Sequence, residues 1–138
     1  MPANLKEMKP KVLRQMNQFL AEAKKQGIQL LVTQGFRSKV EQDALYAIGR
    51  TIKGNKVTNA RGGESEHNYG VCFDVCGFDG KKVSYNINWA KIAQVWKSMD
   101  GTWGGDWKSF PDKPHFSYTL GYSIKAFKEN KVDWTKFN

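Results

Sequence analysis

The segment from Val71 to Phe78 sets the strongest constraint on how this chain can fold. Apolar side chains at positions 71, 73 and 75 alternate with Cys72, Asp74 and Cys76. Successive side chains of a β-strand point to opposite faces, so this pattern predicts a strand with one apolar face. Asp74 is then expected on the other face, between the two thiols.

The remaining elements follow from helical periodicity and from short β-rich apolar runs. We predict helices over 11–25, 38–48, 89–99 and 123–129, and further strands over 28–34, 82–85 and 115–118. Ser38 and Glu41 form a capping-box pattern, and Asp79-Gly80 favours a hairpin turn. The order α-β-α-β-β-α-β-α predicts an α+β fold with a small, mainly antiparallel sheet flanked by helices.

Length and composition are typical of one globular domain over residues 1–138. No apolar run approaches the ~20 residues that span a bilayer, so we expect no stable membrane insertion. The stretch from Met1 to Lys11 lacks the apolar segment of a signal peptide. We therefore expect synthesis in the cytoplasm without a signal peptide.

The net charge of +9 predicts attraction to polyanions such as nucleic acid, an anionic membrane surface or a bacterial wall. The lysines are scattered, mostly towards the two ends, and the sequence has no arginine-rich run or aromatic RNA-binding signature. We therefore expect no nucleic-acid partner, and solubility is the simpler interpretation of the charge.

Both histidines of the chain, His67 and His115, follow a predicted loop, adjoin a predicted strand and lie near an aspartate. Imidazole and carboxylate groups are ligands of catalytic zinc sites, which use three protein ligands and leave a fourth position for water. Asp112, three residues before His115, could then act beside the metal without binding it. The spacing from His67 to Asp74 is a weak signal alone, and structural histidines are the simpler alternative.

The backbone around the two histidines carries further signals. An extended backbone would place Ser65 and His67 on one face. Gly70 allows a bend between His67 and the strand that follows. Pro114 removes a donor and restrains the backbone just before His115.

Six stretches in fixed order form a longer pattern. They are Gln34-Gly35-Phe36-Arg37-Ser38, Glu41-Gln42-Asp43-Ala44-Leu45-Tyr46, Thr58-Asn59-Ala60-Arg61-Gly62-Gly63, Ser65-x-His67-x-x-Gly70-x-x-x-Asp74, Gly104-Gly105-Asp106-Trp107-Lys108-Ser109-Phe110 and Asp112-x-x-His115-Phe116. The pattern, over about residues 13–118, resembles the VanY-like zinc peptidases. Within these it is most similar to the L-alanyl-D-glutamate endopeptidases of phage endolysins and bacterial wall hydrolases.

The resemblance implies that His67, Asp74 and His115 bind Zn²⁺. It also implies that Asp112 is the general base and acid for a metal-activated water. The resemblance implies these roles, and the spacing of the residues alone does not establish them.

Three other residues receive roles in the same way, each with an alternative. The resemblance implies that Arg37 contacts the substrate and stabilises the developing oxyanion, although a surface ion pair is possible. It implies that Ser65 binds substrate, although a hydrogen bond within its loop is an equal alternative. Asp106 is the rival of Asp112 as the base, but we expect it to hold its loop or a ligand histidine.

Two positions depart from the family pattern. Many relatives carry an acidic residue two positions after the last histidine, where this chain has Ser117. Cys72 replaces the usual small apolar residue, and we hypothesise that it lies beside the metal without binding it. Cys72 and Cys76 would be about 13 Å apart along a strand, too far for a disulfide, so we expect two buried thiols.

The resemblance implies a monomeric, zinc-dependent peptidoglycan peptidase that hydrolyses the L-Ala-D-Glu bond of stem peptides. One alternative is a D,D-carboxypeptidase of the same fold, and another, of a different class, is a non-catalytic polyanion or cell-wall binding module. We expect one catalytic domain without a separate wall-binding domain, so that the positive charge concentrates it on the wall. An endolysin that reaches the wall after release at lysis fits this picture.

Overall fold

A five-stranded antiparallel sheet organises the computed structural model, which describes residues 3–138. Its strands are β1 (Leu30–Gln34), β2 (Cys72–Phe78), β3 (Val83–Ser84), β4 (Thr102–Trp103) and β5 (His115–Ser117). The strand order is β1-β2-β5-β4, and β3 forms a hairpin with β2. The predicted α+β fold with a small antiparallel sheet is confirmed.

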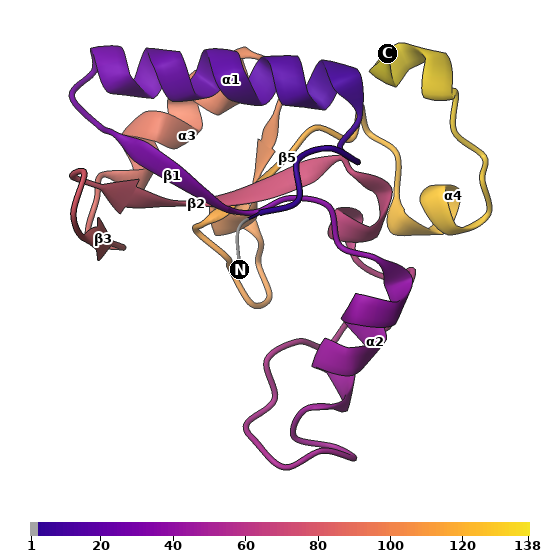
Figure 1. Ribbon diagram of the computed structural model, residues 1–138. Helices are drawn as coiled ribbons and strands as arrows, with labels where there is room; N and C mark the ends of the chain where they lie inside the picture. The colour runs from indigo at the N-terminus through magenta and orange to yellow at the C-terminus, as the bar shows by residue number, and fades with distance from the viewer. Residues whose placement is uncertain (1–2) are drawn as a thin grey trace.

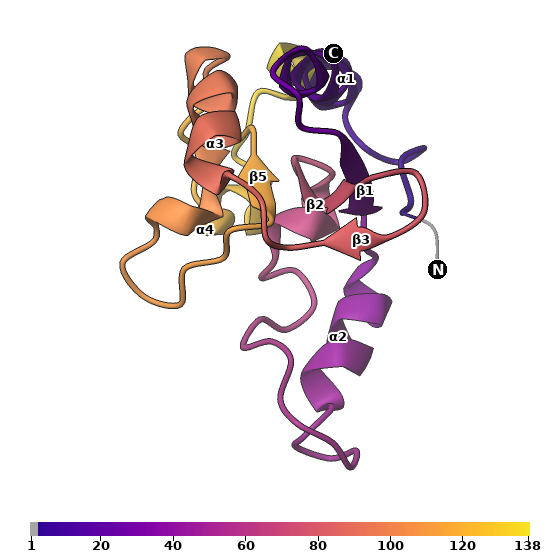
Figure 2. The ribbon, with the colours of Figure 1, turned by 90° about the vertical axis from the view of Figure 1, so that its left-hand side faces the viewer.

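Four α-helices and three 3₁₀-helices surround the sheet. They are α1 (Pro10–Lys25), α2 (Lys39–Ala47), α3 (Trp89–Ser98), α4 (Ile124–Lys128), η1 (Glu66–Tyr69), η2 (Gly104–Asp106) and η3 (Trp134–Phe137). Helices α1 and α3 pack against each other on one side of the sheet, whereas α2 and the long loop after it project away from the opposite side (Figures 1 and 2). No helix within residues 3–138 is long and apolar enough to cross a membrane.

The core is an aromatic cluster between α1, α3 and the apolar face of the sheet. Phe19 of α1 lies 5.0 Å from Phe116 and 5.9 Å from Phe73, measured between ring centroids, and 5.4 Å from Trp96 of α3. All four rings are fully buried. Burial of such rings supplies much of the free energy that holds a small sheet to its helices.

Side-chain caps fix where the helices begin. Ser38 Oγ accepts a hydrogen bond from Glu41 N, and Glu41 Oε1 accepts one from Ser38 N, each over 3.0 Å. This reciprocal pair is the capping box that the sequence predicts. Asn88 caps α3 in a similar way by accepting a hydrogen bond from Lys91 N.

The loop over residues 101–113 is more ordered than the sequence indicates. It contains β4 and η2, and Trp103 Nε1 closes it by donating a 2.7 Å hydrogen bond to Lys113 O. Neither element has a sequence signal of its own, because each is only two or three residues long, and β4 depends on pairing with β5. The predicted loop before His115 is therefore corrected to include a short edge strand and one 3₁₀ turn.

Gly104 has no side chain, which allows this loop to pack closely against the start of β5. A Cβ atom at Gly104 would lie 2.3 Å from Asp112 O and 2.9 Å from His115 Cβ. Since a backbone atom cannot move aside without a large energetic cost, we expect Gly104→Ala to lower the free energy of unfolding by about 1–3 kcal/mol. Urea denaturation measures this change, with Ser109→Ala on the exposed part of the same loop as control. An unfolding midpoint equal to that of the control would contradict this account of the loop.

Candidate metal centre

Three side chains that the sequence singles out meet on the face of the sheet opposite the core. His67 comes from η1, and Asp74 and His115 are direct antiparallel partners on β2 and β5. Asp74 Oδ1 lies 3.4 Å from His67 Nε2 and 3.1 Å from His115 Nδ1. Two imidazoles and one carboxylate thus converge on one point, a donor set that suits Zn²⁺.

Hydrogen bonds behind His67 direct its ring. His67 Nδ1 lies 2.7 Å from Gly35 O, and a carbonyl oxygen can only accept, so Nδ1 carries the proton. The other ring nitrogen, Nε2, faces Asp74 and is the atom available to a metal ion. The main chain is held as well, because Arg37 N donates to His67 O over 2.9 Å.

The backbone that follows Ser65 differs from the one expected. The backbone from Glu66 to Tyr69 forms η1 instead of continuing extended, and Ser65 Oγ accepts a hydrogen bond from His67 N over 3.2 Å. The expectation of an extended chain here is wrong, because this serine caps the 3₁₀ turn. Gly70 ends the turn with a φ of 70°, the bend that the sequence predicts.

The side chains of this centre shift one another's pKa values strongly. Burial opposes a positive charge on His67, but Cys72 and Asp74 outweigh it and raise the pKa of the ring to about 10. Burial likewise disfavours an ionised Asp74, yet hydrogen bonds from His115 and His67 hold its pKa far below the usual value. A site that attracts protons this strongly also suits a divalent cation.

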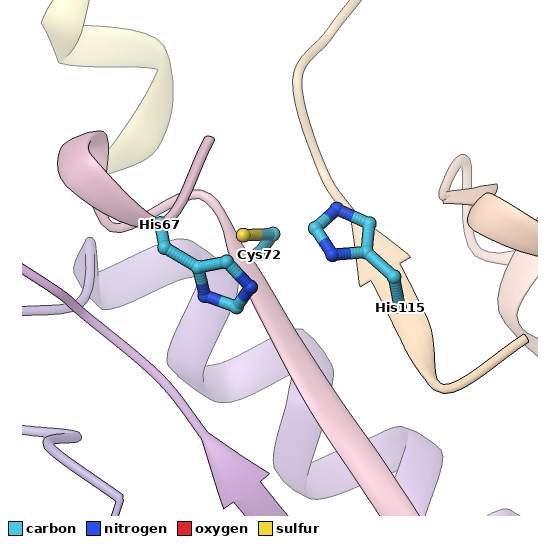
Figure 3. A group of neighbouring side chains, drawn as sticks. All are labelled: His67, Cys72 and His115. Carbon is cyan, nitrogen blue, oxygen red and sulfur yellow. The ribbon is translucent and has the colours of Figure 1, made fainter. Parts of the chain in front are cut away.

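Cys72 is a fourth potential donor. Its Sγ and one ring nitrogen each of His67 and His115 all lie within 4.8 Å of one another. Figure 3 shows the thiol at the start of β2, near both rings. Cys72 and Cys76 are both fully buried. The carboxylate of Asp74 lies directly beside both histidine rings.

A cavity of about 1030 Å³ opens from this centre. One part of its wall is apolar and comes from α2 and the loop after it, namely Ala44, Leu45, Ile48, Val57 and Ala60. The polar part includes Arg37, Ser65 and Asp112 beside the two histidines, and the indole of Trp107 lines the same space. Most of the residues expected at the site therefore line a single space.

Asp112 is half-buried at the metal end of this cavity. Its main chain is fixed on both sides, since Asp112 N donates to Gly104 O and Asp112 O accepts from His115 N. Burial and the nearby Asp74 raise the pKa of its carboxyl group. A carboxylate with a raised pKa is better suited to exchanging protons near neutral pH.

Arg37 extends its guanidinium along the cavity wall. Nη1 donates to Gln42 Oε1 over 2.8 Å, and Nη2 donates to Gln34 Oε1 over 3.1 Å. Within residues 3–138 no carboxylate forms an ion pair with it. Two neutral amides therefore orient its guanidinium group.

Asp106 is not brought to the centre. It is 53% exposed and pairs with Lys97 Nζ of α3 at 2.5 Å. Of the two roles considered for it, this contact agrees with holding the loop and not with holding a ligand histidine.

Sequence reasoning missed Glu66. Its Oε1 lies 2.7 Å from His115 Nε2 and accepts a hydrogen bond from Ser117 Oγ. The sequence shows only an acidic residue next to His67. Its contact with His115 cannot be inferred until β5 is known to lie beside η1.

Two buried imidazoles that meet at one carboxylate beside a large cavity define a candidate metal-dependent hydrolase. A model of the VanY family, described as D-alanyl-D-alanine carboxypeptidase, matches residues 5–123. The chain is also 40% identical over 121 residues to the peptidoglycan L-alanyl-D-glutamate endopeptidase CwlK of Bacillus subtilis, covering 79% of this chain and 72% of CwlK. The chain belongs to the VanY family.

Solved structures show the same relationship. The L-Ala D-Glu endopeptidase ChiX of Serratia marcescens is similar with a TM-score of 0.65 and 26% identity, over 85% of this chain and 84% of ChiX. A variant of the vancomycin resistance D,D-pentapeptidase VanY in complex with Zn(II) has a TM-score of 0.63 over 99% of this chain and 93% of its own. Its 14% identity shows a shared fold alone.

The donor geometry generates a prediction about the third ligand. We expect Asp74→Asn to weaken zinc binding on the order of 100-fold, because it removes the charge between two buried rings. We expect Cys72→Ala to keep an affinity close to that of the wild type. Competition with a chromophoric chelator measures both. A Co²⁺-loaded wild-type protein with thiolate-to-metal charge-transfer absorption would show instead that Cys72 binds the metal.

Proposed function

We propose that this protein is a zinc-dependent peptidoglycan peptidase that hydrolyses the L-Ala-D-Glu bond of stem peptides. The observation that carries the proposal is the meeting of His67, Asp74 and His115 at the end of a cavity that Asp112 also lines. The similarity to CwlK and ChiX supports this bond as the one cleaved.

The residues present fit a zinc ion held by His67, Asp74 and His115. Each offers an atom directed at a common point, and the Nδ1 proton of His67 is already committed to Gly35 O. A bound zinc ion would act as a Lewis acid towards water and the scissile carbonyl group.

Asp112 performs the proton transfers in this proposal. Its carboxylate accepts a proton from the attacking water and later passes it to the leaving amine of D-Glu. The raised pKa of the group favours both steps, because the acid and the base are then closer in free energy near neutral pH. The fixed main chain on either side of Asp112 keeps the carboxylate within the cavity.

Arg37 is the cation of the cavity wall and is proposed to stabilise negative charge on the substrate. Its guanidinium is held by Gln34 and Gln42, so little reorganisation is needed when an oxyanion develops. Ser65 is proposed to contact substrate, as it lines the same cavity while capping η1.

The protein is proposed to act on the bacterial wall as a monomer, after release at lysis. The charge of +9 supports attraction to the anionic wall. A purely wall-binding module would share this charge but would have no use for a base beside a metal.

A D,D-carboxypeptidase is the second candidate, because the matching family model is described by that activity. Digestion of purified muropeptides followed by mass spectrometry separates the candidates. We expect a new free amino terminus on D-Glu, lost when the metal is removed by EDTA. Release of D-Ala alone would support the second candidate, and unchanged muropeptides would leave only wall binding.

The role of Asp112 generates a separate prediction. We expect Asp112→Asn to lower kcat by about 10²- to 10⁴-fold, because the amide cannot accept the proton, while zinc stays bound. Asp106→Asn makes the same chemical change on the exposed part of the same loop and should leave turnover unchanged. Muropeptide turnover and bound zinc are measured on the same preparations. An Asp112→Asn variant with full turnover would rule out this base.

A further inference from the structure

Glu66 occupies a position that the proposed mechanism does not use. Its side chain is 22% exposed and reaches from η1 to β5, where Oε1 lies 2.7 Å from His115 Nε2. The same oxygen accepts a hydrogen bond from Ser117 Oγ.

The contact decides which nitrogen of His115 carries a proton. An ionised carboxylate can only accept, so the nitrogen facing Glu66 keeps its hydrogen. That nitrogen is Nε2, so Nδ1, which faces Asp74, is the atom left to bind a metal ion once the ion has displaced its proton. His67 is arranged the other way round, with Nδ1 protonated by its contact with Gly35 O.

Ser117 explains why Glu66 stays in place. Residues 115 and 117 lie on the same face of β5, so the serine hydroxyl lies beside the imidazole of His115. Its hydrogen bond to Oε1 fixes the carboxylate at the ring. The acidic residue expected at position 117 is absent, and Glu66 delivers a carboxylate to this place from another element.

We propose that Glu66 is a positioning residue that holds His115 with Nδ1 directed at the metal, and that Ser117 holds Glu66. The inference rests on the proposed metal centre and adds two residues to it. Carboxylate partners of ligand histidines fix ring orientation and tautomer, and their loss costs about 10- to 100-fold in metal affinity.

Zinc affinity, measured by competition with a chromophoric chelator, tests the proposal without relying on activity. We expect Glu66→Gln to weaken binding by about 10- to 100-fold. Glu64→Gln is the matched control, since this substitution makes the same charge change two residues away. Glu64 Oε1 accepts a hydrogen bond from Arg61 N. Equal affinities for both variants and the wild type would overturn the role of Glu66, whereas a wild type that binds no zinc would overturn the metal centre itself.

A rescue experiment separates positioning from general stability. We expect Glu66→Ala to lose affinity and the double variant Glu66→Ala/Ser117→Glu to regain most of it, because the carboxylate returns from β5. Loss of affinity in both variants with unchanged unfolding midpoints of the metal-free proteins would contradict the proposal.

The tautomer of His115 can also be measured directly in the wild-type protein. In the zinc-loaded wild type, ¹⁵N NMR should show a proton on Nε2 of His115 and none on Nδ1. The reverse pattern would overturn the inference even if a variant failed to fold.

Discussion

The antiparallel register between β2 and β5 is the constraint on which the site depends. Phe73 pairs with Phe116, and the next pair along is Asp74 with His115. Because neighbouring residues of a strand face opposite sides, burying the two rings in the core forces the carboxylate and the imidazole onto the other face. A slip of one residue would exchange the two faces. The free energy of aromatic burial therefore also holds two proposed metal ligands together.

The position of the third proposed ligand, His67, is fixed by different interactions. His67 lies in a single 3₁₀ turn, which would have little stability by itself. Its position is set by the serine cap, by the contact of Nδ1 with Gly35 O, and by the main-chain bond from Arg37 N. The strand hydrogen bonds thus place one half of the centre, and local polar contacts place the other half.

Much of this arrangement could be predicted from the sequence. The alternation around Asp74, the capping box at Ser38 and the glycine bend at Gly70 each have a local physical cause, and the structure contains all three. The histidines were conspicuous because the chain has only two. Long-range contacts gave no such signal: neither the contact of Glu66 with His115 nor the pairing of Asp106 with Lys97 follows from spacing. Elements of two or three residues, such as β4, were also invisible, since pairing and not propensity stabilises them.

The loop after α2 is attached to the rest of the fold mainly at its base. Gln42 Nε2 donates to Ala60 O, and Asp43 Oδ1 accepts from Gly62 N, so the far end of this loop is tied back to α2. Residues between these ties supply part of the apolar cavity wall but none of the proposed ligands. Substrate preference and metal chemistry are therefore separable in this architecture, and the loop can be exchanged or diversified as a cassette while the reaction centre is left intact.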